Sequence, residues 1–378
     1  MNKVFKIVWS KSKQCYVVVS EYAKSNGGKK KVLATVLAGL MMAGVLAPQQ
    51  ALAGADYGSS SVVLEPNNLL PGQGNTGGGK NRIAIGGQNN LGSSGNGRIA
   101  IGYGNATEHD SAVAIGSSNR ATGGASTALG VRSTATGAAT VAIGNMTNAD
   151  QKGAIAIGSY VNVKTDGTGV LPTGVYSTAV GGKSRASAEN ATALGTAAEA
   201  SGVGATATGN TAKALDQSAS AFGDSANATT VQSTAVGYSA NATGLNASAF
   251  GNLSMASGKY ATAVGSEAHA TGQNGFAGGA KVNATGSEST AVGYNSTASG
   301  AGSVTLGRDA TASATGAYAM GYGANATNTS AFAIGSRANA GAYGSMAIGK
   351  GATTKAQDAT STYSYSGTGG AVGASGYN

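Results

Sequence analysis

Along most of this chain, an apolar residue followed by glycine recurs every 14 residues. The longer run spans residues 180–348, and two positions within it, Thr208 and Gly278, keep the phase but lack the large apolar side chain. A second run with the same period spans residues 101–157. A fixed period of this kind indicates a solenoid, in which each repeat contacts only its neighbours and no repeat is stable alone.

The positions within one repeat predict two short strands. With the apolar residue as position 0, position −1 is almost always alanine and position −2 is threonine, serine or apolar. This β-branched, alternating segment predicts a strand of about four residues. Alanines at +4 and +6 flank a polar residue at +5, which predicts a second strand with its alanines facing inward. Glycines at +1 and +8 supply the two bends of each coil.

Stacked coils place equivalent strands in parallel, about 4.8 Å apart. Because the interior of so small a coil is narrow, we expect position 0 to fill it against the alanines at +4 and +6. This expected repeat core comprises Ile101, Ile115, Leu129, Ile143, Ile157, Val180, Leu194, Phe222, Val236, Phe250, Val264, Val292, Leu306, Met320, Ile334 and Ile348. One thin roll also leaves a sheet face lined by alanine and threonine uncovered, so we expect copies to associate.

The positive charge of the chain lies mainly in its first residues. The formal net charge is +9, but residues 1–31 hold eight lysines against one acid, Glu21. From residue 54 onward, 16 basic and 14 acidic side chains leave a net charge of +2. No basic stripe remains, so we do not expect nucleic-acid binding.

A secretory signal explains those lysines. Lys29–Lys31 forms a positive n-region, Val32–Leu46 an apolar h-region and Ala51–Ala53 a small-residue cleavage motif, so we predict cleavage before Gly54 and export. About 15 apolar residues are short for a membrane span, which needs roughly 20, although an uncleaved anchor is the alternative. The only cysteine, Cys15, precedes the cleavage point, so the exported chain forms no disulfide.

Two parts of the sequence resemble one family. Met1–Gly28, with Val8-Trp9-Ser10 and the segment Val17–Ser25, resembles the extended signal peptide region of large Gram-negative autotransporters. The strings SAVAIGS at 111–117, GAIAIGS at 153–159 and SAFAIGS at 330–336 look like the head repeats of trimeric autotransporter adhesins. The resemblance implies an all-β head, a homotrimer of left-handed parallel β-rolls built from 14-residue coils. It also implies display on the bacterial surface.

The repeats divide the chain into segments. We assign 1–53 to the extended signal peptide, 54–80 to an N-terminal lead or cap, 81–350 to the head and 351–378 to a Gly/Ser/Tyr-rich segment. Residues in excess of the 14-residue period lie around 163–176, and we expect them to form a loop that extends from one bend. This loop is either a binding element or an insertion without a function. No stalk or membrane anchor is recognisable. We therefore expect a head portion of a longer product, a truncated gene product, or a variant anchored by another protein.

A smaller surplus of two residues separates Ile85 from Ile101. It contains several glycines, so we expect a second loop here that includes Asn89 and Asn90.

Residues for catalysis or metal binding are scarce. The exported chain has two histidines, His109 and His269, and its carboxylates are scattered without phase. In Glu108-His109-Asp110, adjacent side chains on a strand point to opposite faces, so this string is not expected to bind a metal. We therefore expect no enzyme activity, no metal and no cofactor.

Six residues are candidates for an exposed contact surface. Three tyrosines lie at position +2 and three asparagines at +5: Tyr238, Tyr294, Tyr322, Asn227, Asn241 and Asn325. Exposed tyrosines can anchor contacts, but they could equally seal the bends. Several of the asparagines begin Asn-x-Ser/Thr strings, which are the acceptor sequence for N-glycosylation. The repeat itself generates this pattern, so we expect an outward row of stacked amides.

The sequence favours an adhesin head. Many weak, equivalent contacts to extracellular matrix, to a cell-surface receptor or to other copies would be multiplied by oligomerisation. A structural spacer or biofilm module is the alternative. An ice- or mineral-binding solenoid would need a Thr-x-Thr ladder, and Thr206 and Thr208 form the only such pair on the first strand. The identity of the ligand is not encoded in any pattern of the sequence.

Overall fold

The computed structural model describes residues 5–10, 15–20, 62–64, 75–93, 95–163, 174–354 and 363–364. The predicted cleavage site at Ala53 and Gly54, most of the insertion at 163–176 and most of the segment 351–378 lie outside these residues. The chain forms two compact units, Met1–Ala51 and Leu52–Asn378. In the first unit, β1 (Phe5–Ser10) pairs antiparallel with β2 (Cys15–Ser20).

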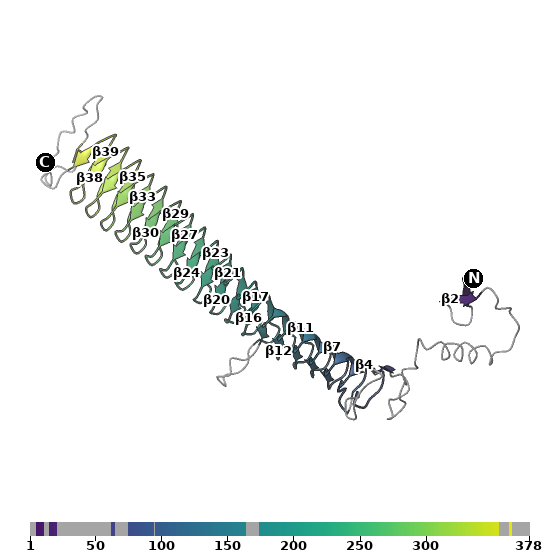
Figure 1. Cartoon of the computed structure of the whole chain (residues 1–378). Helices are drawn as coiled ribbons and strands as arrows, with labels where there is room; N and C mark the ends of the chain where they lie inside the picture. Colours follow the sequence, from purple (N-terminus) through teal and green to yellow (C-terminus); the bar gives the residue numbers. More distant parts are fainter. Residues whose placement is uncertain are drawn as a thin grey trace. The chain divides into compact units, whose positions relative to one another are not determined.

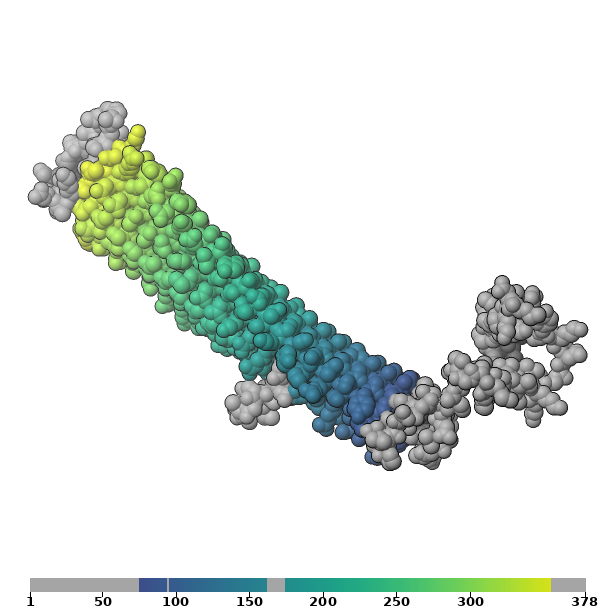
Figure 2. All heavy atoms as spheres, in the orientation of Figure 1, coloured from purple at the N-terminus to yellow at the C-terminus, as the bar shows by residue number. Residues whose placement is uncertain are grey.

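The second unit is a parallel solenoid that forms a narrow rod (Figures 1 and 2). Its strands belong to two ladders, in which each strand pairs in parallel with the equivalent strand of the next coil, so that Val236 lies opposite Phe250 and Ala228 opposite Ala242. The described residues contain strands and turns and no helix. The all-β solenoid of 14-residue coils expected from the period is thereby confirmed.

The first ladder contains the strands that carry positions −2 to 0. They are β3 (Val62–Leu64), β4 (Ile83–Gly87), β5 (Ile99–Tyr103), β7 (Val113–Ser117), β9 (Thr127–Val131), β11 (Val141–Asn145), β13 (Ile155–Ser159), β15 (Thr178–Val180), β17 (Thr192–Leu194), β19 (Thr206–Thr208), β21 (Ser220–Phe222), β23 (Thr234–Val236), β25 (Ser248–Phe250), β27 (Thr262–Val264), β29 (Phe276–Gly278), β31 (Thr290–Val292), β33 (Val304–Leu306), β35 (Tyr318–Met320), β37 (Phe332–Ile334), β39 (Met346–Ile348) and β41 (Tyr363–Ser364).

The second ladder contains 18 two-residue strands in the described part of the chain. They are β6 (Ala106–Thr107), β8 (Arg120–Ala121), β10 (Thr134–Ala135), β12 (Asn148–Ala149), β14 (Asn162–Val163), β16 (Arg185–Ala186), β18 (Glu199–Ala200), β20 (Lys213–Ala214), β22 (Asn227–Ala228), β24 (Asn241–Ala242), β26 (Met255–Ala256), β28 (His269–Ala270), β30 (Asn283–Ala284), β32 (Thr297–Ala298), β34 (Thr311–Ala312), β36 (Asn325–Ala326), β38 (Asn339–Ala340) and β40 (Thr353–Thr354).

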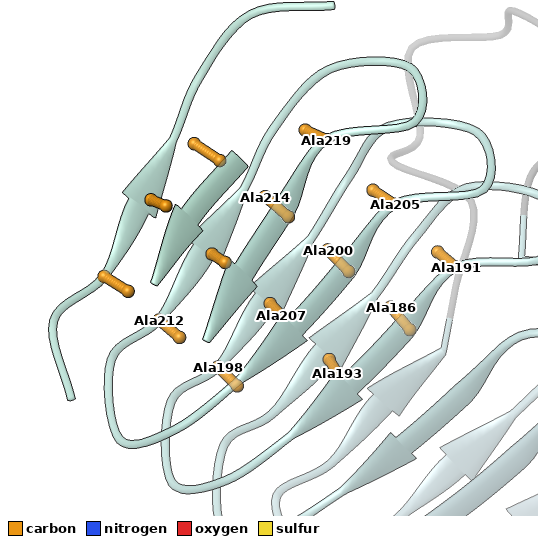
Figure 3. Packing of buried hydrophobic residues seen from close by; sticks show 14 of the residues in the cluster. Ala186, Ala191, Ala193, Ala198, Ala200, Ala205, Ala207, Ala212, Ala214 and Ala219 are labelled. Carbon is orange, nitrogen blue, oxygen red and sulfur yellow. The ribbon is translucent and has the colours of Figure 1, made fainter. Parts of the chain in front are cut away.

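Small side chains fill the interior between the two ladders. Positions −3 and −1 come from the first ladder and positions +4 and +6 from the second, and alanine at any of them is buried, as for Ala191, Ala193, Ala198 and Ala200. Figure 3 shows these alanines in rows that continue from coil to coil. The expectation that the alanines at +4 and +6 face inward is confirmed.

Position 0 does not lie in the interior, so the expected repeat core is wrong. Side chains alternate along a strand, and because positions −3 and −1 point inward, positions −2 and 0 point outward. Leu306 is 47% exposed and Val264 42%. The ladders approach so closely that alanine already fills the space between them. The residues that therefore lie outside the roll, partly or well exposed, are Ile101, Ile115, Leu129, Ile143, Ile157, Val180, Leu194, Phe222, Val236, Phe250, Val264, Val292, Leu306, Met320, Ile334 and Ile348.

The glycine at +1 determines how closely the coils stack. Gly237 has a φ of 132°, which side chains strongly disfavour, and a Cβ atom there would lie 2.5 Å from the carbonyl oxygen of Gly251 in the next coil. The glycine therefore makes the bend and also leaves room for the neighbouring backbone.

The coils before residue 164 have a polar interior. Asn89, Asn105 and Asn119 occupy position +4 and are buried. The Oδ1 atom of Asn105 accepts hydrogen bonds from the backbone N and the Nδ2 of Asn119, both at 3.1 Å, and its Nδ2 donates to Ile101 O at 3.0 Å and Gly116 O at 2.9 Å. The expected loop containing Asn89 is thus wrong at this residue, which belongs to an internal amide ladder.

Two arginines occupy interior position −3 in the first coils. Arg82 and Arg98 are both buried. Arg98 donates to the carbonyl oxygens of Gly78 and Glu108. Burial lowers the pKa of Arg98, the neighbouring Arg82 lowers it further, and Asp110 opposes both effects. The two surplus residues lie in the bend between Leu91 and Arg98.

Candidate interaction surfaces

The coil presents four outward surfaces. We call positions −2 and 0 of the first ladder the apolar face, and positions +5 and +7 of the second ladder the polar face. The bend at +2 and +3 is the first rim, and the bend at +8 to +10 is the second rim. Each surface repeats in register along the roll, because equivalent residues of successive coils lie side by side.

The apolar face changes along the roll. In β4, β5, β7, β11 and β13, both of its positions are branched apolar residues, whereas from β15 to β27 position −2 is threonine or serine. Both positions are apolar again from β33 to β39, where the rings of Tyr318 and Phe332 stack with centroids 4.7 Å apart and an interplanar angle of 1°. The face is therefore an apolar column, interrupted at two coils, that widens toward both ends.

The two interruptions in the apolar column differ. At Gly278, a Cβ atom would lie 2.9 Å from the ring of Phe276, so this phenylalanine at position −2 covers the missing side chain. At Thr208, the neighbour at −2 is Thr206, and the column becomes polar for one coil.

The polar face carries charge only in its first part. Arg120 and Glu108 lie 3.6 Å apart, as do Arg185 and Glu199. From residue 227 to residue 354, positions +5 and +7 hold no Lys, Arg, Asp or Glu. The three predicted asparagines lie here. Asn227 Nδ2 donates to Asn241 Oδ1 at 3.0 Å, and Asn325 Nδ2 donates to Asn339 Oδ1 at 3.3 Å.

The three predicted tyrosines lie on a different surface, the first rim. The guanidinium group of Arg308 lies between the rings of Tyr294 and Tyr322, with its Cζ atom 5.6 and 5.7 Å from their centroids. Arg337 approaches Tyr322 at 5.8 Å. Tyr238 lies on the same rim but four coils away, and it is 58% exposed. The six candidate contact residues therefore belong to two surfaces.

One shallow pocket of about 310 Å³ is lined by Gly95, His109, Asp110 and Gly124. Asp110 Oδ1 accepts a hydrogen bond from Asn96 N at 2.6 Å, so this carboxylate stabilises the wide bend.

Within the described ranges, no group of three or more His, Cys, Asp or Glu residues is placed to hold a metal ion. No helix long and apolar enough to cross a membrane occurs in those same ranges.

Sequence reasoning missed two features that register would have revealed. Asn89, Asn105 and Asn119 align at +4 once position 0 is aligned, and they replace the alanine found there downstream. Arg308 stands 14 residues from a tyrosine on either side, so a parallel register by itself places it between the two rings.

A rod whose four long surfaces repeat in register is the architecture expected of a protein that makes many equivalent contacts along its length. Comparison with known families supports this class. Residues 1–48 match the extended signal peptide of the type V secretion system. The YadA head domain repeat matches ten segments, which are residues 93–119, 121–145, 135–160, 173–198, 200–226, 217–240, 228–254, 256–281, 284–310 and 312–338.

These head repeats cover more than half of the chain, which belongs to the trimeric autotransporter adhesins. It is an adhesin-type protein, exported and displayed at the outer-membrane surface of a Gram-negative bacterium. No curated protein matches the chain.

Proposed function

We propose that three copies of this chain pack through the apolar face, and that the trimer adheres to host matrix or cell surfaces through the surfaces left outside. One observation supports the proposal most strongly: large apolar side chains point out of the roll in nearly every coil, and Phe222, Phe250 and Leu306 are 40%, 39% and 47% exposed. An apolar stripe of this length is not stable in water unless a partner covers it.

A second copy of the same chain is the partner that fits every coil. Equivalent side chains recur once per coil, about 4.8 Å apart, so parallel copies in register bring like residues to the same level. Cyclic symmetry buries the same patch on every subunit, and members of this family form homotrimers.

The polar face and parts of the rims then remain outside. Half-buried amides and hydroxyls at +5 and +7 repeat along the roll, as at Asn241 and Thr243. Single contacts to such groups are weak, but binding is strengthened when one trimer presents many of them together.

The test is to place charge on the apolar face. Ile143→Glu, Phe250→Glu and Ile334→Glu, one in each third of the roll, should abolish the trimer in sedimentation-velocity analysis of the exported, processed protein. The matched control carries Thr134→Glu, Met255→Glu and Asn339→Glu on the polar face and should remain trimeric with an unchanged β circular dichroism spectrum.

Each outcome bears on the proposal. Loss of the trimer in the first variant alone, with or without loss of fold, would support the apolar face as the interface. A trimer that survives the first variant would contradict it. Adhesion of wild-type trimer to surfaces coated with matrix proteins, and to host cells, tests the second half. Absence of binding to every such surface would contradict the adhesive role.

A further inference from the structure

The last five coils concentrate their charge on a single surface. Residues 292–351 contain only four charged side chains, Arg308, Asp309, Arg337 and Lys350, and all of them occupy +2 or +3. Within residues 292–351 the first rim therefore carries three cations and one acid, a net charge of +2 (3 − 1), and the other positions of this range carry none. Charge at the C-terminal end of the roll is thus confined to one narrow line.

Aromatic rings hold the arginines of this line in place. Tyr294, Arg308, Tyr322 and Arg337 alternate along this line, and the distances from each arginine Cζ atom to the neighbouring ring centroids are 5.6, 5.7 and 5.8 Å. A planar guanidinium that stacks on a ring keeps its N–H groups in its own plane, so stacking does not consume them. Because the stack restricts the side chains before any ligand arrives, less conformational entropy is lost on binding.

The donors of the two arginines remain largely available. The Nε atom of Arg308 lies 3.2 Å from Asp309 Oδ2, and the arginine side chain is 64% exposed. In the described part of the chain, Arg337 forms no ion pair with a carboxylate. Lys350 lies one coil further along the same rim. Arg308 is thus paired with Asp309 through its Nε atom, while its terminal N–H groups and those of Arg337 have no carboxylate partner among the described residues.

We propose that this rim binds a linear anionic polysaccharide bearing sulfate or carboxylate groups, with the polymer lying along the axis of the roll. The inference rests on the proposed adhesive function and names a ligand class for one surface. The guanidinium fork matches the paired oxygens of a sulfate or carboxylate group. The tyrosine hydroxyls between the arginines supply donors and acceptors for sugar hydroxyl groups.

The spacing of the charges favours a polysaccharide over other polyanions. Arg308 and Arg337 lie two coils apart, about 10 Å, which suits anionic groups that recur once per pair of sugars rather than on every unit. An extended acidic peptide brings carboxylates to one side about every 7 Å. A nucleic acid needs many neutralised phosphates for tight binding, and three cations are too few.

The test measures binding of the exported, processed protein to immobilised heparin over a series of salt concentrations. Arg308→Gln with Arg337→Gln should weaken binding at least tenfold and reduce the slope of log K against log salt by about 2 per bound rim. Lys183→Gln with Lys213→Gln removes the same charge from coils outside residues 292–351, where no arginine lies between two tyrosine rings, and should leave both quantities nearly unchanged. Arg308→Lys with Arg337→Lys keeps the charge and should recover only part of the affinity, because the planar fork is lost.

Three results would overturn the inference. They are no heparin binding by the wild type at physiological salt, equal weakening by the Lys183/Lys213 control, and equal binding of an uncharged polysaccharide such as dextran, of polyglutamate or of DNA. Trimeric state and adhesion to protein-coated surfaces are measured on the same variants. If both persist while heparin binding is absent, only this inference fails. If wild-type protein adheres to no surface at all, the proposed function itself fails.

Discussion

The coils before residue 164 and those after residue 173 share the 14-residue period, but different hydrogen bonds close the bend between their two strands. In the later coils the +4 residue is alanine, serine or, once, valine. In most of these coils its N–H group donates back to the +1 glycine of its own coil, as Ala226 N does to Gly223 O at 3.3 Å. In the earlier coils, Asn119 N donates instead to Asn105 Oδ1 in the preceding coil at 3.1 Å. The bend at Asn119 thus closes on the neighbouring coil, whereas the bend at Ala226 closes on itself.

The consequence extends to the strands. Where the Nδ2 of an asparagine donates to the glycine carbonyl of the next coil, the first-ladder strand has five residues, as in β7 (Val113–Ser117). The strands β11 and β13 also have five residues, although the side chain on Gly144 O is Ser133 and Gly158 has no such bond in the described residues. Where alanine occupies +4, the strand ends at position 0 and has three residues, as in β23 (Thr234–Val236). The same period therefore supports two kinds of coil, and the difference lies in side chains that the period does not fix.

The glycine at +1 is common to both regions and should show the largest effect. Gly237→Ala places a Cβ atom 2.5 Å from Gly251 O at a φ that only glycine readily adopts, so we expect a loss of about 3 kcal/mol or more of stability. Gly116→Ala, with a contact of 2.0 Å to Gly130 O, should cost at least as much. Thermal unfolding followed by circular dichroism measures both.

Gly204 provides the control for backbone strain alone. It has a φ of 65° and nothing within 4 Å of its would-be Cβ, so Gly204→Ala should cost only about 1 kcal/mol. A milder effect for Gly116→Ala than for Gly204→Ala would show that the two regions do not share the stacking constraint.

Exchanging the +4 residues tests the difference between the regions directly. Asn119→Ala removes the acceptor of Ser133 N and the donor to Gly130 O, so we expect a loss of about 2–3 kcal/mol, with faster hydrogen exchange at the Ser133 amide. Ala226→Asn forces an amide into an interior filled by alanine and should cost a similar amount.

The outward neighbour at +5 is the matched control for this exchange. Asn227→Ala removes a half-exposed side chain whose Nδ2 donates to Asn241 Oδ1, so it should change stability by less than about 1 kcal/mol. An equal loss in Asn227→Ala and Asn119→Ala would contradict the special role of the internal ladder.

The arginine-containing coils should respond locally. Arg98→Ala removes hydrogen bonds to Gly78 O and Glu108 O and leaves a cavity, whereas relief from burying a charge offsets part of the loss. We expect a net cost of about 2 kcal/mol, visible by hydrogen exchange as faster opening of residues 75–110. Arg98→Met, which refills the volume, should recover roughly half. Equal acceleration beyond residue 174 would contradict a local response, because a solenoid couples each coil mainly to its neighbours.

The sequence alone predicted the period, the two strands per coil and the inward alanines, because these depend on backbone alternation and on glycine. It did not predict which face of the first strand lies inside. Large apolar residues such as Leu306 usually mark a core, but here the interior is too thin for them, and their burial depends on other copies of the chain. The surface to which each candidate contact residue belongs was harder still to predict. Tyr294 and Asn227 are both expected outside the roll, and only the folded coil places the first on the first rim and the second on the polar face.

Surface ion pairs should contribute least in both regions. Arg185 and Glu199 lie 3.6 Å apart on adjacent coils, and their side chains are 48% and 31% exposed, so solvent screens the attraction. Arg185→Gln should therefore change stability by less than about 0.5 kcal/mol, a shift in Tm of at most a few degrees. Arg120→Gln, which removes the pair with Glu108 in the earlier coils, should behave in the same way. High salt should abolish what small difference remains. A clear drop in Tm for only one of the two variants would show that charge, as well as the internal amides, distinguishes the two kinds of coil.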